Sequence, residues 1–249
     1  MRLTLLTLIA ITALTCASSA PAADAKPAKI KVLIITGDDV GVHKWRETTE
    51  ATREVLTAGK FDVKVSEDPL ILESATALKN YDLVFLNYYN AKNQPLSDLA
   101  KANLLGFVKG GKGLAVAHLA SASFKEWDDF HKMVGRYWVM GKDKSGHGPR
   151  APFKVNIKSQ DHPITKGVQD FQADDELYAK LQGDVPINVL ATADSDWSKQ
   201  TEPLVFTLEY GQGRVFHETF GHDVKAIKTE SVAKLIQRGC EWAATGKVE

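Results

Sequence analysis

The stretch of residues 110–118 constrains the fold of this chain more than any other. It reads Gly-Gly-Lys-Gly-Leu-Ala-Val-Ala-His, a glycine turn followed by an apolar run that ends at His118. An apolar run of this length is typical of a strand buried on both faces, as in a parallel α/β sheet. Because ligands of such sheets bind outside the carboxyl ends of the strands, we expect His118 to lie at a functional edge. Other folds of this shape carry a nucleophile there, whereas this chain offers an imidazole.

Strand and helix patterns alternate through the first half of the chain. The patterns predict strands over 31–36, 61–65 and 81–86, and helices over 44–58 and 98–109. The second helix leads into the strand that ends at His118. Alternation at this interval favours parallel βαβ units with right-handed crossovers.

The second half is richer in strands. Residues 153–157 alternate strictly between apolar and polar, as do parts of 187–191 and 204–208. Tyr210-Gly211-Gln212-Gly213 is a turn signal that predicts a hairpin with the strand 214–217. A last helix is predicted over 225–244, so the whole pattern favours an α/β domain with a mostly parallel sheet.

The amino terminus has the pattern of a secretory signal peptide. A basic start, an apolar core and small residues predict cleavage near residue 23, a linker over 24–29 and one domain over 30–246. The apolar core is too short for a stable membrane anchor. Cys16 suggests lipidation, but Thr15 is a poor residue before a lipidated cysteine, so we do not expect a lipoprotein. We expect an exported protein, periplasmic or secreted.

Charge and cysteine content exclude several function classes. Lys+Arg and Asp+Glu are both 31, and no basic stripe stands out, so nucleic acid is not an expected partner. Only Cys240 would remain after cleavage, within a helical pattern, which argues against an intrachain disulfide and against thiol catalysis. The chain has no Walker loop, dinucleotide fingerprint, HExxH or CxxC motif.

Three histidines fall at predicted strand-to-helix junctions: His43, His118 and His222. In a parallel sheet the first two lie at one edge, and His222 can join them. The helix dipole should keep His43 neutral, so that it can accept a proton, donate a hydrogen bond or bind a metal. The alternative is that each is an ordinary polar residue at a junction.

An acidic run, Asp174-Asp175-Glu176, precedes Leu177 and Tyr178. Such runs often form solvated turns, but a functional interpretation needs one carboxylate turned inward, and we select Glu176. A carboxylate beside neutral histidines can act as a general base or orient an imidazole. The sequence leaves open whether Asp175 or Glu176 faces the site.

The remaining histidines differ in context. His147 lies in a glycine-rich loop suited to folding over a site, and Arg150 beside it is suited to an anionic or hydroxyl-rich ligand. His162 precedes a proline and is expected to shape the chain. His131 is expected to be surface or core filler, and the face of His217 on its hairpin is left open.

Taken in order, these fragments resemble the ThuA-like (trehalose-utilisation) family over the whole predicted mature chain. The matching fragments are His43 with Trp45, 113–118, His147, 162–164, 175–178, 213–216, 221–222 and 238–243. The resemblance implies the fold of class I glutamine amidotransferases, a flavodoxin-like three-layer sandwich with a mostly parallel central sheet. Those enzymes carry a cysteine at the strand-to-helix turn. Here His118 and Leu119 stand there, so amidotransfer should be absent.

The resemblance also implies a role in carbohydrate use, on glycosides that include 3-keto forms. We therefore expect an enzyme for isomerisation, elimination or hydrolysis, with His118, His222 and Glu176 catalytic. The side chains expected to bind substrate are His43, Trp45, His147, Arg150 and Tyr178. Four such ligands could equally hold a divalent metal, and spacing does not choose between acid–base and metal-assisted chemistry.

The alternatives are a non-catalytic carbohydrate-binding protein that uses the same pocket, and a scaffold. The sequence does not identify the substrate or the oligomeric state.

Overall fold

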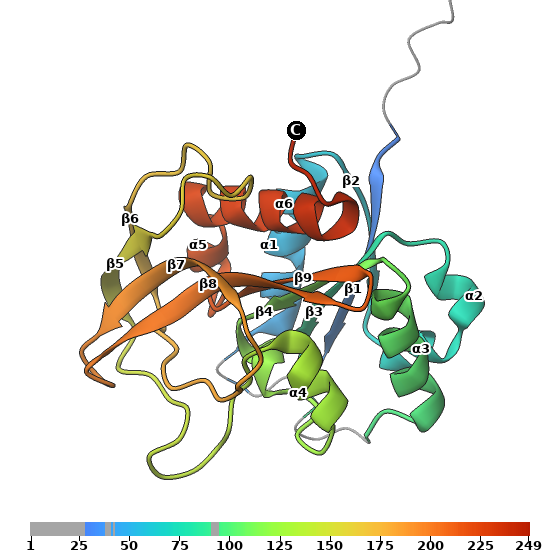
Figure 1. The fold of residues 1–249 in the computed structure, drawn as a ribbon, viewed down its shortest axis with the longest axis horizontal. Coiled ribbons are helices and arrows are strands. Elements are labelled where there is room, and N and C mark those ends of the chain that lie inside the picture. Colours follow the sequence, from blue (N-terminus) through green and yellow to red (C-terminus); the bar gives the residue numbers. More distant parts are fainter. Residues whose placement is uncertain (1–27, 38–40, 42, 91–94) are drawn as a thin grey trace, which may run out of the picture.

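The computed structural model describes residues 28–37, 41, 43–90 and 95–249 (Figure 1). The predicted signal peptide, most of the linker and Cys16 lie outside these residues. Along the described chain the elements are β1 (Ile30–Gly37), α1 (Trp45–Thr57), β2 (Phe61–Ser66), η1 (Pro69–Glu73), α2 (Ala75–Leu78), β3 (Leu83–Tyr88), α3 (Asp98–Lys109), β4 (Gly113–Ala117), η2 (His118–Ala122), α4 (Asp128–Val134), β5 (Ala151–Ile157), β6 (Phe171–Asp175), β7 (Asn188–Ser195), β8 (Gln200–Tyr210), β9 (Gly213–Glu218), α5 (Val224–Ile227) and α6 (Glu230–Thr245). Within the described part, no helix is both long enough and apolar enough to cross a bilayer.

The described strands form one mixed sheet with the order β2-β1-β3-β4-β9-β8-β7-β5-β6. The pairs from β2 through β9 are parallel, whereas β9 with β8, β8 with β7, β7 with β5 and β5 with β6 are antiparallel. The prediction of a mostly parallel sheet is therefore wrong for the later strands.

Short connections account for the antiparallel pairing of β7, β8 and β9. Antiparallel neighbours can be joined by a tight turn, whereas parallel neighbours need a crossover of a dozen residues or more. The predicted hairpin of β8 and β9 is confirmed, with Tyr210 paired to Gly213. Gly211 lies between them at φ +65°, a left-handed conformation that favours glycine.

Helices cover both faces of the sheet (Figure 1). Apolar side chains of α1 and α6 pack on one face, against Val32 and Ile34 of β1, while α3 and α4 pack on the other, with Leu33 and Ile35. Because both faces are buried, the central strands are continuous apolar runs. Leu114, Ala115 and Val116 of β4 are all fully buried, which confirms the expectation for that strand. The last predicted helix is divided into α5 and α6.

Helix α6 approaches the sheet closely through a glycine. A Cβ at Gly239 would overlap the buried ring of Phe216 in β9. By contrast, Gly106 on α3 is exposed and has no atom within 4 Å of an added Cβ. These two helical glycines therefore differ in what a methyl group would meet.

We expect Gly239→Ala to lower the free energy of unfolding by about 1–3 kcal/mol, because the Phe216 ring must shift within a filled core. The matched variant Gly106→Ala adds the same methyl group in open space, and should raise stability by about 0.5–1 kcal/mol. Denaturant unfolding of both variants measures the difference. Equal effects of the two substitutions would contradict the close packing of α6.

Candidate functional site

Three histidines meet at the carboxyl edge of the parallel strands. His43 follows β1 and precedes α1, His118 directly follows β4, and His222 lies between β9 and α5. Nε2 of His43 lies 3.1 Å from Nε2 of His118, and the ring centroids of His43 and His222 are 5.0 Å apart. Segments from distant parts of the chain thus place three imidazoles within contact distance.

Glu176 is the acid that faces these imidazoles. Its Oε2 lies 3.6 Å from Nε2 of His43, 3.5 Å from Nε2 of His118 and 3.6 Å from Nε2 of His147. Its Oε1 lies 3.2 Å from Nδ1 of His222. The carboxylate therefore stands at the centre of four histidines.

Asp175 faces the opposite way and is 1% exposed. Its carboxylate accepts three backbone N–H groups: Gly221 at 2.7 Å, Glu176 at 2.8 Å and His222 at 3.2 Å. Successive side chains of a strand point to opposite faces, and Asp175 ends β6. This carboxylate therefore joins the backbone of Glu176 to that of His222, although the two residues come from different parts of the sheet.

His118 has an unusual backbone conformation, with φ +45°. Such a conformation in a non-glycine residue costs about 1–3 kcal/mol and persists only where its surroundings enforce it. Nδ1 of His118 lies 2.7 Å from the carbonyl oxygen of Thr219, and the ring stacks on Tyr178 at 4.1 Å. Because a carbonyl only accepts, Nδ1 carries the proton. Nε2 of His118 then presents its lone pair to the cluster.

The electrostatics of the cluster favour an ionised Glu176 and a neutral His43. Burial alone would raise the pKa of Glu176, but contacts with His118 and His43 hold that pKa well below its usual range. Burial lowers the pKa of His43, and the neighbouring His118 lowers it further, against the opposing effect of Glu176. The neutrality expected for His43 is therefore supported by burial.

The donor set fits a divalent transition metal. Ligand atoms of His43, His118, Glu176 and His222 all lie within 4.8 Å of one another. Glu176 Oε2 and His222 Nδ1 are buried and make no hydrogen bond in the described structure, an arrangement that proteins rarely leave uncompensated. Imidazole nitrogens with one carboxylate oxygen suit Zn²⁺ and related ions. These four residues are therefore the ones that would hold such an ion.

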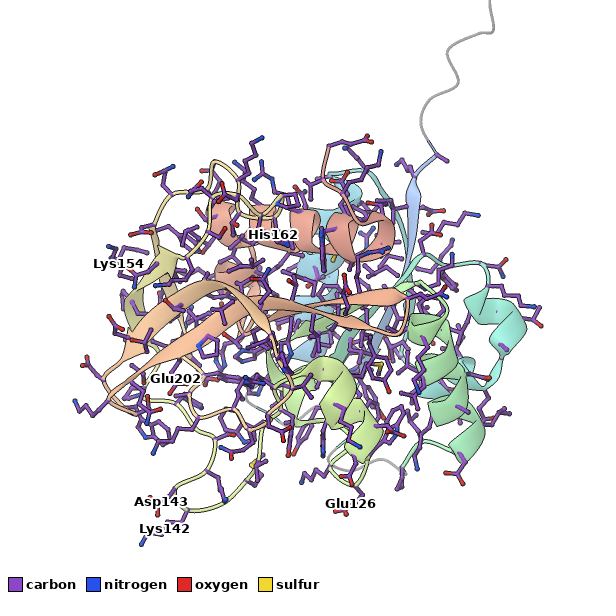
Figure 2. The ribbon with its side chains drawn as sticks, viewed as in Figure 1. Glu126, Lys142, Asp143, Lys154, His162 and Glu202 are labelled. Carbon is purple, nitrogen blue, oxygen red and sulfur yellow. The ribbon has the colours of Figure 1, made fainter. Side chains whose placement is uncertain are left out.

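His147 lies beside this four-residue group on the long loop between α4 and β5. Lys142 and Asp143 stand at the projecting end of this loop (Figure 2). Nδ1 of His147 lies 2.6 Å from the carbonyl oxygen of Gly148, so its Nε2 faces Glu176 as an acceptor. The His147 side chain is 32% exposed, compared with 3% for His118. His147 is thus the imidazole most open to a ligand.

Two other predicted substrate-binding residues make contacts within the protein. Arg150 pairs with Asp223 at 2.7 Å and with Asp174 at 3.5 Å. The Tyr178 ring is buried and lies between His118 and Trp138, and burial raises its pKa well above the usual value. Arg150 therefore ties the His147 loop to the segments that carry Glu176 and His222.

Trp45 lies next to the cluster. Together with His43 and His118 it lines a small cavity of about 20 Å³. The Arg46 guanidinium lies 3.8 Å from the centre of the Trp45 ring. Asn87 and Tyr89 line the same cavity, and the sequence offered no signal for either.

The other histidines lie away from the cluster. His131 stacks on Tyr137 at 3.8 Å, and His162 lies 5.3 Å from the Trp242 ring on α6. Figure 2 shows His162 beside that helix. His217 is buried against Phe206, where desolvation lowers its pKa to about 4. His217 therefore lies on the buried face of its hairpin, a point that the sequence had left open.

Some site features had no counterpart in the sequence analysis. The bonds of Asp175 to the backbone, the carbonyl of Thr219 and the packing of Trp138 on Tyr178 depend on strand register and loop paths. Short sequence patterns carry no information on these. Only the alternation of Asp175 and Glu176 along a strand could have suggested their opposite directions.

Comparisons with known proteins agree with this architecture. The chain is similar to the crystal structure of a ThuA-like protein from Parabacteroides merdae, with 29% identity and a TM-score of 0.77 over 88% of this chain and 91% of that one. A ThuA-like protein from Bacteroides uniformis shares the fold at 17% identity and TM-score 0.69, over 92% of this chain and 98% of that one. A cytoplasmic protein of Salmonella typhimurium also shares the fold, at 18% identity and TM-score 0.61, over 87% of this chain and 100% of that one.

A comparison with curated proteins finds no match. The model of the ThuA family, described as trehalose utilisation, matches residues 31–243, which is most of the chain. The chain therefore belongs to the ThuA family.

Proposed function

We propose that this protein is an exported carbohydrate-active enzyme that acts on glycosides, including 3-keto forms, with the help of a divalent metal. The family description supports a carbohydrate-related role. The observation that carries the rest is the partly buried group of His43, His118, Glu176 and His222, whose ligand atoms lie close to one another. Export rests on the signal-peptide pattern of residues 1–23.

A metal at this group would act as a Lewis acid toward a carbonyl or hydroxyl oxygen of the sugar. The chain itself would supply the proton transfer. His147 is suited to this role because it lies outside the four-residue group, is partly exposed and presents Nε2. A keto group acidifies the neighbouring C–H bond, so a base at this position could start isomerisation or elimination.

The direct test is incubation of the purified protein with glycosides and their 3-keto forms, with and without chelator, followed by mass spectrometry. We expect a changed product that is lost on chelation and restored by added metal. Return of every ligand unchanged, with binding detected by titration, would instead support the non-catalytic carbohydrate-binding protein. Absence of both binding and turnover would reject the carbohydrate proposal.

We expect Glu176→Gln to weaken Zn²⁺ binding by at least about 100-fold, because the variant removes the only charged donor of the group. Titration calorimetry on chelator-treated protein measures this loss. Glu126→Gln, on the surface near α4 (Figure 2), is the control and should bind as the unaltered protein does. Equal affinity of the two variants would contradict the proposed metal site.

We expect Asp175→Asn to weaken Zn²⁺ binding by about 10–100-fold, as is typical when a partner that orients the ligands is lost. An amide cannot accept from three backbone N–H groups and would point its own NH₂ at one of them. Asp174→Asn is the neighbouring control, since that carboxylate pairs with surface cations. A loss of thermal stability in Asp175→Asn with unchanged metal affinity would mean that Asp175 supports the fold alone.

The pH dependence of stability should reveal Glu176 in metal-free protein. Its pKa is lower in the folded state than the ordinary value of 4.5, so the unfolded chain binds more protons as the pH falls through that value. The stabilisation is therefore present above pH 4.5 and is lost below it. The melting temperature should fall less steeply with decreasing pH for Glu176→Gln than for the unaltered protein. The same pH dependence in both proteins would contradict the lowered pKa of Glu176.

A further inference from the structure

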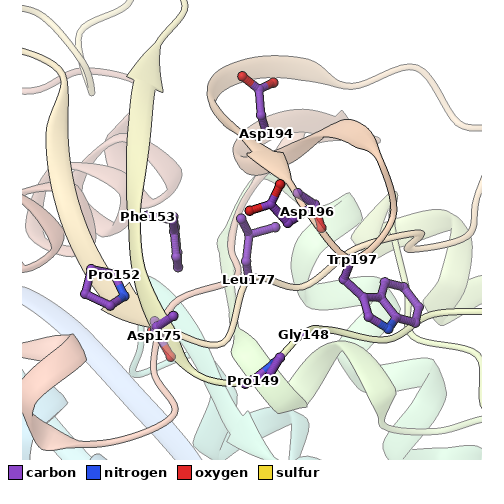
Figure 3. A pocket seen from close by; sticks show the side chains of 11 residues that line it. Gly148, Pro149, Pro152, Phe153, Asp175, Leu177, Asp194, Asp196 and Trp197 are labelled. Carbon is purple, nitrogen blue, oxygen red and sulfur yellow. The ribbon is translucent and has the colours of Figure 1, made fainter.

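A cleft lies next to the histidine cluster, on the other side of the segments that carry His147 and Glu176. It has a volume of about 360 Å³ and is lined by Pro149, Phe153, Leu177, Asp196 and Trp197, among others (Figure 3). This size falls within the range of small-molecule sites, about 300–1,000 Å³. The cavity beside His43 and His118 is far smaller, at about 20 Å³. The molecule therefore offers a roomy cleft that the proposed chemistry does not use.

The cleft and the histidine cluster share two stretches of chain. Asp175 and Leu177, on either side of Glu176, line the cleft, whereas the Glu176 carboxylate faces the imidazoles. Gly148 and Pro149, which directly follow His147, line it as well. The two sites thus lie back to back, and a ligand in the cleft would touch the loop that carries His147.

Trp197 is the most distinctive residue of the cleft. Its side chain is 45% exposed, which is unusual for a large aromatic residue. The indole is nevertheless held in place, because it packs on Gly146 so closely that a Cβ there would overlap the ring. The ammonium of Lys180 lies 5.2 Å from the ring centre. A fixed, half-exposed indole offers a flat apolar surface at little entropic cost.

The polar groups of the cleft favour an uncharged, hydroxyl-bearing ligand. Asp194 and Asp196 stand near its rim, and Figure 3 shows the Asp196 carboxylate above Leu177. Asp194 already accepts from Thr201, and Asp196 lies 4.0 Å from the ammonium of Lys199. Carboxylates that are partly compensated in this way disfavour an anion and attract a cation only weakly. Apolar walls with a few acceptors suit the C–H face and hydroxyl groups of a sugar ring.

We propose that this cleft is a second carbohydrate-binding site, with Trp197 as the stacking surface and Asp196 as a hydrogen-bond acceptor. For the class of its ligand, this assignment rests on the function proposed above. Its location rests on the cleft alone. Binding there is separate from the metal group, so the two sites can be tested independently.

The test follows the indole N–H signals of ¹⁵N-labelled full-length protein by NMR during titration with trehalose and methyl α-glucoside. The chain has five tryptophans, and Trp197→Phe and Trp45→Phe assign the two reporters. Trp197 reports on the cleft, and Trp45 reports on the cavity beside His43. We expect sugar to move the Trp197 signal.

Variants then locate the binding. Asp196→Asn should weaken the sugar affinity measured at Trp197 several-fold, and Trp197→Ala should reduce saturation transfer to the sugar about tenfold, as the loss of one aromatic contact implies. His118→Asn should leave the cleft affinity unchanged while weakening Zn²⁺ binding. Leu99→Ala removes another exposed apolar side chain on α3, at the other end of the sheet, and should have no effect on either (Figure 1).

Several outcomes would overturn the assignment. A sugar-induced shift confined to Trp45 would place carbohydrate at the histidine cluster alone and would leave the function proposed above intact. A Trp197 shift caused by tetramethylammonium and not by sugar would make the cleft a cation site. A shift that depends on protein concentration without sugar would mean that a second copy occupies the cleft. If sugar moves neither signal while Zn²⁺ still binds, the cleft assignment fails and the metal site stands, and the assay with 3-keto glycosides decides the function proposed above.

Discussion

The site depends on keeping an ionised carboxylate buried. Removing a charged group from water is costly unless opposite charge or hydrogen-bond donors compensate for it. Imidazoles surround Glu176 on several sides, and a cation held between them would compensate its charge, while Asp175 holds the backbone that positions it. Two neighbouring acids thus have different roles, because Asp175, the last residue of β6, and Glu176, which follows it, point in opposite directions. One carboxylate faces the ligand group, and the other fixes the loop that carries His222.

The parallel and antiparallel halves of the sheet contribute different residues to the site. The parallel half ends in His43 and His118 at one edge, where the left-handed conformation of His118 turns its ring toward the cluster. The antiparallel half adds Glu176, which directly follows β6, and brings the His147 loop alongside. Neither half alone contains a complete set of donors. The ion pairs of Arg150 with Asp174 and Asp223 then join the two halves at the surface.

Local patterns were sufficient for part of this architecture. The buried strand that ends at His118, the helices α1 and α3 and the turn at Gly211 depend on neighbouring residues, and each was predicted from them. Strand direction in the second half depends on which distant strands pair, and the prediction was wrong there. The predicted strand-to-helix junctions placed three histidines at one edge of the sheet. The orientation of Asp175 and the ion pairs of Arg150 depend instead on strand register and on the paths of the loops. Those are properties of the assembled chain, and no short motif encodes them.

The four donors come from the loop after β1, the end of β4, the end of β6 and the loop after β9, so they span nearly the whole domain. Bringing such distant segments together carries the full entropy of closing long loops. An unfinished chain during synthesis holds at most a pair or a trio of these side chains, spread over flexible backbone. A metal bound by all four donors would therefore link the first strand of the domain to the loop that follows its last strand.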